Sequence, residues 1–136
     1  MTKNNYNEKG VFNYDNYISE ISHEGERWQP FGGSYYVSDH GRVFSLHTDK
    51  LLNPILHKGN SLYYYHIKIC DSGKSKIYLL HRLIALVFCE NTNPAERTQV
   101  HHVDGNPFNN NASNLVWLTP AEHKAIHASM KAGAAA

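Results

Sequence analysis

The feature that most constrains the fold is a stretch near the C-terminal end in which two short apolar runs flank a loop of turn-forming residues. Residues 100–103 and 115–118 have the composition of short strands. Between them, residues 104–107 read Asp-Gly-Asn-Pro and residues 109–111 are three Asn. Gly and Asn tolerate positive φ and Pro fixes its own φ, so these residues favour turns. The stretch therefore predicts two strands joined by a long loop.

A helix start follows the second predicted strand directly. Thr119 is a favourable N-cap, Pro120 suits the first helical position, and Glu122 completes a capping box with Thr119. The residues that follow are rich in Ala, which favours a helix. Two strands, a loop and a capped helix together predict a ββα unit.

Four histidines of this unit have spacings that suit a metal site. His123 and His127 are four residues apart and would share one face of the helix, where two imidazoles can bind one ion. His101 and His102 are adjacent on a strand, so their side chains should point to opposite faces. One of them could therefore join the metal, while the other accepts a proton from water. Imidazole suits that second role because it ordinarily titrates near neutral pH.

Two alternatives involve no catalysis. The four rings could be ordinary polar surface residues in a chain that has 10 His, or they could form a structural zinc site. Structural zinc sites use four closed ligands and commonly include Cys, whereas Cys70 and Cys89 lie outside the unit and form no Cys-x-x-Cys pair. His81 is more typical of a packing or hydrogen-bonding residue. No spacing argument gives a role to the other five histidines, which are His23, His40, His47, His57 and His66.

On these residues, segment 99–130 resembles the HNH (His-Me finger, ββα-metal) nuclease motif. The resemblance implies that His102 is the general base that activates water. It also implies that His101, His123 and His127 hold one divalent ion, which could be Mg²⁺, Mn²⁺, Zn²⁺ or Ni²⁺. Asn114 resembles the asparagine whose side chain ties the loop between the strands and so fixes the base. The implied activity is endonucleolytic hydrolysis of double-stranded DNA, with 5′-phosphate and 3′-hydroxyl products.

The details of the motif resemble two groups of nucleases. The all-histidine ligand set is similar to that of the bacteriocin DNases. The His-His-x-Asp-Gly-Asn opening at 101–106 and the Asn-Leu-x-Trp-Leu-Thr stretch at 114–119 are more similar to phage and intron-encoded homing endonucleases. Those relatives often carry Asp or Asn at one ligand position. Three imidazoles suit Zn²⁺ or Ni²⁺, while oxygen-rich sites suit Mg²⁺.

The residues before the motif predict a small antiparallel β part and a closing helix. Residues 26–30 and 35–46 resemble a module often found ahead of HNH motifs in phage nucleases, with a tight Asp-His-Gly turn between two strands. Residues 63–69 and 76–80 predict a hairpin, and residues 79–88 have helical spacing. We therefore expect an α+β fold. Its expected parts are an arm at 1–24, a β-rich DNA-binding module with its helix at 25–90, the nuclease motif at 91–131 and a tail at 132–136.

Positive charge is concentrated in the middle of the chain. The net charge is only +1, but residues 28–89 hold seven Lys and Arg against three Asp and Glu. Five of these cations are candidate phosphate contacts, namely Arg42, Lys58, Lys68, Lys74 and Lys76. Arg82 could instead stabilise charge on the scissile phosphate, as an arginine does in related nucleases, or it could form a structural ion pair.

Composition favours a single domain. Hydrophobic residues make up 41% of the 136 residues, and we see neither a signal peptide nor an apolar run of about 20 residues that could span a membrane. Two cysteines without an evident partner fit a reducing cytoplasm. A monomer with one such site would cut one strand at a time, and a homodimer could cut both. The competing functions are a DNA-binding or packaging accessory that does not cut, and an RNase built on the same unit.

Overall fold

The expected α+β architecture is present in the computed structural model, which describes residues 8–10, 13–58 and 63–135. The described residues of the first half form one helix and two antiparallel sheets. Its elements are α1 (Tyr14–Ile21), the sheet of β1 (Trp28–Phe31), β2 (Tyr35–Ser38), β3 (Val43–Ser45) and β4 (Lys50–Leu51), and the sheet of β5 (Ile55–Lys58), β6 (Tyr63–Asp71) and β7 (Lys74–Leu79). The second half contains α2 (Leu80–Phe88), β8 (Gln99–His102), the 3-10 helix η1 (Ala112–Asn114), β9 (Leu115–Leu118) and α3 (Pro120–Ala135).

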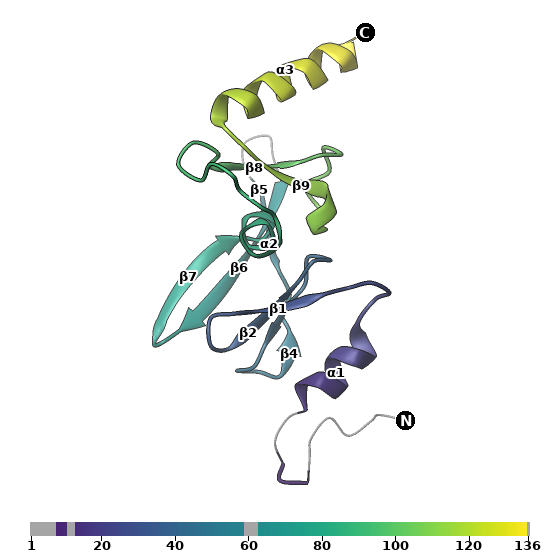
Figure 1. The fold of residues 1–136 in the computed structure, drawn as a ribbon, viewed down its shortest axis with the longest axis vertical. Helices are drawn as coiled ribbons and strands as arrows, with labels where there is room; N and C mark the ends of the chain where they lie inside the picture. Colours follow the sequence, from purple (N-terminus) through teal and green to yellow (C-terminus); the bar gives the residue numbers. More distant parts are fainter. Residues whose placement is uncertain (1–7, 11–12, 59–62, 136) are drawn as a thin grey trace.

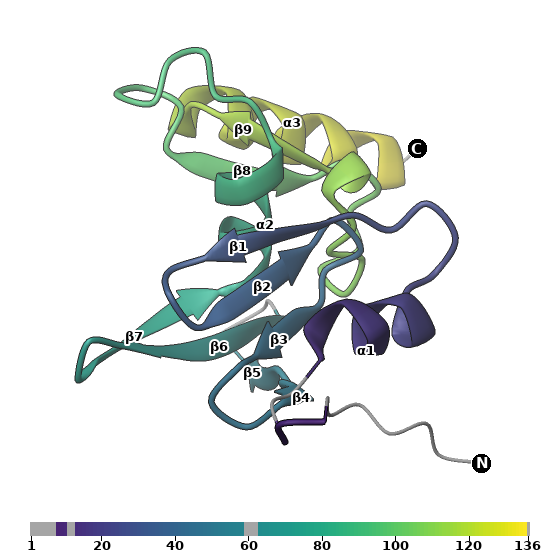
Figure 2. The ribbon, with the colours of Figure 1, turned by 60° about the horizontal axis from the view of Figure 1, so that its bottom comes forward.

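Helix α2 holds the parts together. It lies between the β8–β9–α3 unit and the two larger sheets (Figures 1 and 2). Leu83, Ile84 and Ala85 have no exposed surface and belong to the same core as Val37 of β2 and Trp117 of β9. Burial of one large apolar side chain stabilises the folded state by about 1.5–3 kcal/mol. Because one helix supplies the core of both halves, the ββα unit is fixed relative to the N-terminal sheets.

The predicted ββα unit is confirmed as local structure. β8 and β9 pair antiparallel, with His101 opposite Val116 and His102 opposite Leu115. The capping box at the start of α3 is also present. Thr119 Oγ1 accepts a hydrogen bond from the Glu122 amide at 3.1 Å, and a Glu122 carboxylate oxygen accepts one from the Thr119 amide at 3.0 Å. These bonds fix where α3 begins and hence where its histidines point.

The expected arm and the expected tail both contain helical residues. The expected arm at 1–24 contains α1, whose Tyr17 ring lies 5.2 Å from the ring of Phe44 in β3. Its polar composition hides an amphipathic pattern, because Tyr17, Ile18 and Ile21 recur at helical spacing. The expected tail at 132–136 begins inside α3, since the Ala-rich sequence continues the helix to Ala135. Within the described residues, no helix is long and apolar enough to span a membrane.

Candidate metal and catalytic site

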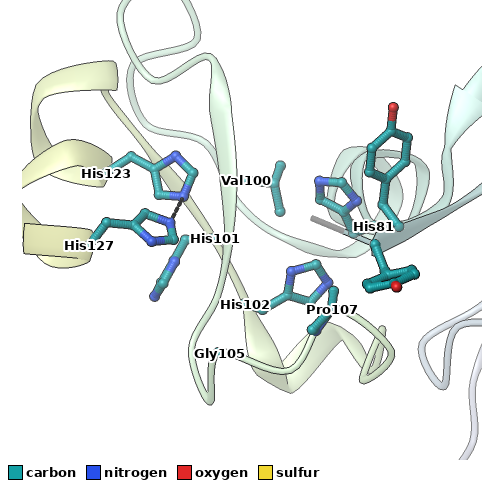
Figure 3. A pocket seen from close by; sticks show the side chains of 10 residues that line it. His81, Val100, His101, His102, Gly105, Pro107, His123 and His127 are labelled. Atoms are coloured by element: carbon teal, nitrogen blue, oxygen red, sulfur yellow. Dashed lines mark hydrogen bonds between the residues drawn. The ribbon is translucent and has the colours of Figure 1, made fainter. Parts of the chain in front are cut away.

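A pocket of about 160 Å³ opens between β8, α2, α3 and the loop that joins β8 to β9 (Figure 3). Four of its lining residues are the predicted site histidines, His101, His102, His123 and His127. The remaining lining residues are Tyr63, Tyr64, His81, Val100, Gly105 and Pro107. The structure therefore brings the predicted base and the predicted ligands into one pocket, although β8 and α3, which carry them, are separated in the sequence by residues 103–119.

Three imidazoles converge on one side of β8. The nitrogens that His101, His123 and His127 would offer to a metal all lie within 4.8 Å of one another. The Nε2 atoms of His123 and His127 are 2.9 Å apart, and Figure 3 shows the His101 ring beside them. Nitrogens bound to one ion at about 2.1 Å lie about 3 Å apart or slightly more. The donor set and its spacing therefore fit one divalent ion.

Gln99 orients one of these rings. His123 Nδ1 lies 2.6 Å from Gln99 Oε1, a contact in which the imidazole N–H donates to the amide oxygen. This leaves the lone pair of His123 on Nε2, the atom that faces His127. Metal-binding histidines commonly have such a partner, which fixes the tautomer. Sequence reasoning missed Gln99, although strand alternation places it on the same face as His101.

The electrostatics of His101 and His123 favour metal binding. Burial lowers the pKa of His101, which is only 6% exposed, and the neighbouring His123 and His127 lower it further. Burial likewise lowers the pKa of His123, with a further contribution from His127. A metal must compete with protons for an imidazole, so rings held neutral are better ligands.

His102 lies on the other side of β8, as strand alternation predicts, and has its own partners. Its Nε2 is 2.8 Å from Oδ1 of Asn110, a loop residue that is 7% exposed. With Asn110 as the acceptor, the proton of the ring is on Nε2 and the lone pair is on Nδ1. The His81 ring packs against His102 at 4.9 Å between centroids (Figure 3). Burial, and then the neighbouring His102, lower the pKa of His81 to about 4.

Asn114 lies where its amide can tie the loop between the strands. Its Nδ2 donates to Asp104 Oδ1 and to the carbonyl of Asn109, both at 2.9 Å, and its Oδ1 accepts from the Asp104 amide at 3.0 Å. The asparagine whose side chain hydrogen-bonds to the His102 ring is Asn110. The row of Asn at 109–111 marks this part of the loop, but its spacing gives no sign of which Asn faces the ring.

The structure gives both candidate arginines a structural role. Arg42 is 23% exposed at its side chain, and it forms an ion pair with Glu26 and donates to the carbonyl of Ile21 at 2.8 Å. Its charge is therefore neutralised inside the module. Arg82 donates to the carbonyl of Thr98 at 2.6 Å and lies over the Trp117 ring at 5.5 Å. Arg82 does not line the histidine pocket, so this geometry gives no support to its predicted contact with the scissile phosphate.

The four candidate lysines lie in different places. The Lys58 ammonium is 5.8 Å from the ring of Tyr63, a pocket residue. Lys68 is an exposed residue of β6. Lys74 and Lys76 line a separate hollow together with Phe31 and Asp71. Of these residues, Lys58 is the one with a direct contact to the pocket wall.

A second group of metal-capable side chains occurs before and after β1 and β2. His23, Glu26 and His40 bring their ligand atoms within 4.8 Å of one another. Burial alone would raise the pKa of Glu26, but hydrogen bonds from Arg42, Ser38 and His23 lower it to about 2. Both carboxylate oxygens accept hydrogen bonds from the Arg42 guanidinium. This group is therefore organised as an ion pair.

Comparison with known proteins relates this chain to HNH endonucleases. A family model described as HNH endonuclease matches residues 78–125, which include every predicted site histidine except His127. An HNH endonuclease of Acanthamoeba polyphaga mimivirus is 36% identical over 107 residues, which are 76% of this chain and 26% of that protein. The DNA endonuclease I-HmuI of Bacillus phage SP01 is 38% identical over 89 residues, or 65% of this chain and 48% of that protein.

A solved structure extends the likeness to the fold. That structure concerns DNA binding and cleavage by the HNH homing endonuclease I-HmuI. It superimposes on this chain with a TM-score of 0.65 at 33% sequence identity. The match covers 79% of this chain and 59% of that one. The present chain thus spans less than half of the length of either curated relative.

Proposed function

The chain belongs to the HNH endonuclease family, and we propose that it is a metal-dependent endonuclease of phage or mobile-element type that hydrolyses phosphodiester bonds of double-stranded DNA. One observation carries this proposal. Three imidazoles converge on one side of β8, and a fourth, His102, is held on the other side of the same strand in the same pocket. Strand β8 thus separates the proposed metal site from the proposed base, and metal-assisted hydrolysis uses both.

His101, His123 and His127 would hold one divalent ion. When bound, the ion supplies Lewis-acid stabilisation of the charge that develops on the phosphate oxygens. Three nitrogen ligands favour Zn²⁺ or Ni²⁺ over Mg²⁺ or Mn²⁺. Gln99 supports this role because its contact with His123 Nδ1 leaves Nε2 as the ligand atom.

His102 would act as the general base. Because Asn110 Oδ1 accepts from Nε2, the Nδ1 atom is left to take a proton from the attacking water. The water would attack in line with the leaving oxygen and give 5′-phosphate and 3′-hydroxyl ends. Asn114 would keep the loop, and with it the base, in place through its three hydrogen bonds.

DNA is the proposed partner. Lys58 beside the pocket and Lys68 on the exposed part of β6 are the cations best placed to contact phosphates, with Lys74 and Lys76 at a greater remove. One pocket of this kind cuts one strand. A monomer would therefore nick, while a homodimer or two sequential nicks would give a double-strand break.

Conversion of supercoiled plasmid to nicked circles tests the proposal. Wild-type protein should nick with added Zn²⁺, Ni²⁺, Mn²⁺ or Mg²⁺ and stop with chelator, and His102→Ala should lose at least about a hundredfold in rate. The matched control is His47→Ala, which removes an exposed histidine outside the pocket and should nick as wild type does. Nicking without metal, or equal rates for His102→Ala and wild type, would contradict the assignment. Binding of DNA without cleavage under any metal would favour the non-catalytic accessory.

A further inference from the structure

The turn between β2 and β3 touches the loop that carries Asn110. The backbone carbonyl of Asp39 accepts a hydrogen bond from the amide of Ala112 at 2.8 Å. Gly41 lies against Asn110 so closely that an added Cβ would be 2.9 Å from the Asn110 carbonyl oxygen and 3.1 Å from its Cβ. Gly41 also has a φ of +83°, a backbone angle that residues with a side chain rarely adopt. The turn and the loop are therefore in backbone-to-backbone contact.

This turn is held rigidly by its own residues. Ser38 has no exposed surface, and its Oγ accepts from the amides of His40 and Arg42, both at 3.1 Å. The Ser38 amide donates to the Arg42 carbonyl at 2.8 Å, and the Arg42 side chain pairs with Glu26. On the other side, Asp39 accepts from the amide and the Nε of Arg27, at 2.9 and 3.1 Å. Such a network leaves the turn little freedom to move away from the loop.

Asn110 connects this rigid turn to the His102 ring. Its backbone packs on Gly41, and its side-chain Oδ1 lies 2.8 Å from His102 Nε2. Two residues further along the loop, the Ala112 amide donates to the carbonyl of Asp39. The side chain that fixes the ring is thus held at its backbone by an element about 70 residues earlier in the sequence.

We propose that the β2–β3 turn of the N-terminal sheet positions the catalytic base, with Gly41 and Asp39 fixing Asn110 and Asn110 fixing the His102 ring. This inference rests on the proposed function of His102. It gives the N-terminal sheet a role inside the active site, in addition to any contact with DNA. Asn110 and Gly41 are positioning residues, because they act through His102. Loss of a partner of this kind lowers activity by about ten- to a hundredfold in comparable sites.

The Gly41→Ala variant tests the contact between turn and loop. Its methyl group would push Asn110 away, so the single-turnover nicking rate should fall by about ten- to a hundredfold. Metal affinity and DNA affinity should change by less than about twofold, because none of the metal ligands moves with Asn110. Gly73→Ala is the matched control. Gly73 has a similar φ of +76° but nothing within 4 Å of the added Cβ, and this variant should nick at the wild-type rate.

Two substitutions at Asn110 keep the test decisive if Gly41→Ala does not fold. Asn110→Leu removes the acceptor at similar size and should lower the nicking rate as Gly41→Ala does. Asn110→Asp keeps an acceptor at the same place and should restore most of the rate. If the turn acts through Asn110, the nicking rate of the Gly41→Ala/Asn110→Leu double variant should be no lower than that of Asn110→Leu alone. Fully additive losses would overturn the proposal.

A spectroscopic readout separates this proposal from the nuclease assignment itself. The ¹⁵N shifts of the His102 ring in the folded full chain should report the Nε2–H tautomer in wild type and in Gly73→Ala. In Gly41→Ala they should report a mixture of the two tautomers. An unchanged tautomer together with an unchanged rate per folded molecule would show that the contact only supports folding. A wild-type protein that never cuts, yet has the expected tautomer, would refute the nuclease function and leave the positioning contact standing.

Discussion

Two groups of metal-capable side chains occur among the described residues, and their neighbours give them different roles. In the first group, His101, His123 and His127 bring their ligand nitrogens together, and His123 has Gln99, a neutral acceptor, as its partner. In the second group, formed by His23, Glu26 and His40, the Glu26 carboxylate is bonded to Arg42. The first arrangement leaves nitrogen lone pairs for an ion, whereas in the second the negative charge of Glu26 is neutralised by Arg42.

The comparison shows why residue types alone do not identify a site. Both groups bring three ligand atoms within 4.8 Å, but a guanidinium in one of them neutralises the carboxylate and would repel a cation. The same ion pair stiffens the turn next to Asn110. The N-terminal charges therefore contribute to rigidity, and the C-terminal imidazoles form the proposed metal site.

The largest expected effect on this comparison comes from Glu26→Gln. A carboxyl whose pKa is lowered from 4.5 to about 2 stabilises the folded state above pH 4.5, and the gain is lost as the pH falls from 4.5 toward 2. The Glu26 side chain has no exposed surface, so the variant should lose about 2–3 kcal/mol at pH 7. Urea denaturation at pH 7 and pH 3 measures the loss, which should be much smaller at pH 3. An equal loss at both values would show that the charge of Glu26 does not matter.

A smaller effect is expected from Gln99→Leu on the metal side of the comparison. Without the amide acceptor, His123 can rotate or change tautomer, so the affinity for Zn²⁺ should fall by about tenfold. Calorimetric titration measures this affinity, with Gln29→Leu, which changes an exposed residue of β1, as the control. Unchanged affinity would mean that the ring is fixed by other contacts.

The smallest effect is expected from removing a single cation near the pocket. Lys58→Ala should weaken DNA binding by a few-fold and lower the salt dependence by about one released counterion. Fluorescence anisotropy at several salt concentrations measures both quantities.

Arg42→Ala should instead lower the free energy of unfolding, since the charge of Arg42 is neutralised within the module. If Arg42→Ala weakened DNA binding as much as Lys58→Ala while its stability remained unchanged, the structural role of Arg42 would be refuted.

Local signals in the sequence predicted much of the fold. The capping box of Thr119 and Glu122, the hairpin of residues 63–69 and 76–80 and the apolar spacing of α2 each depend on residues close in sequence. The histidine spacing predicted which rings could meet because strand and helix periodicities are fixed.

The contacts that sequence reasoning missed are long-range. Asn110 contacts His102 through the fold of the loop, and its backbone depends on Gly41 far upstream. The roles of Arg42 and Arg82 likewise depend on partners, Glu26 and Thr98, that no periodicity brings together. A charge count shows that cations are present, but only the fold shows which of them are already paired.

The most direct test of the central claim is the metal-binding stoichiometry, measured by calorimetric titration of the full chain with Zn²⁺ and Ni²⁺. We predict one ion per chain in wild type and in the His23→Ala/His40→Ala double variant. Binding should be lost, together with plasmid nicking, in the His123→Ala/His127→Ala double variant. Retained binding in that second variant, or loss of binding in the first, would contradict the account.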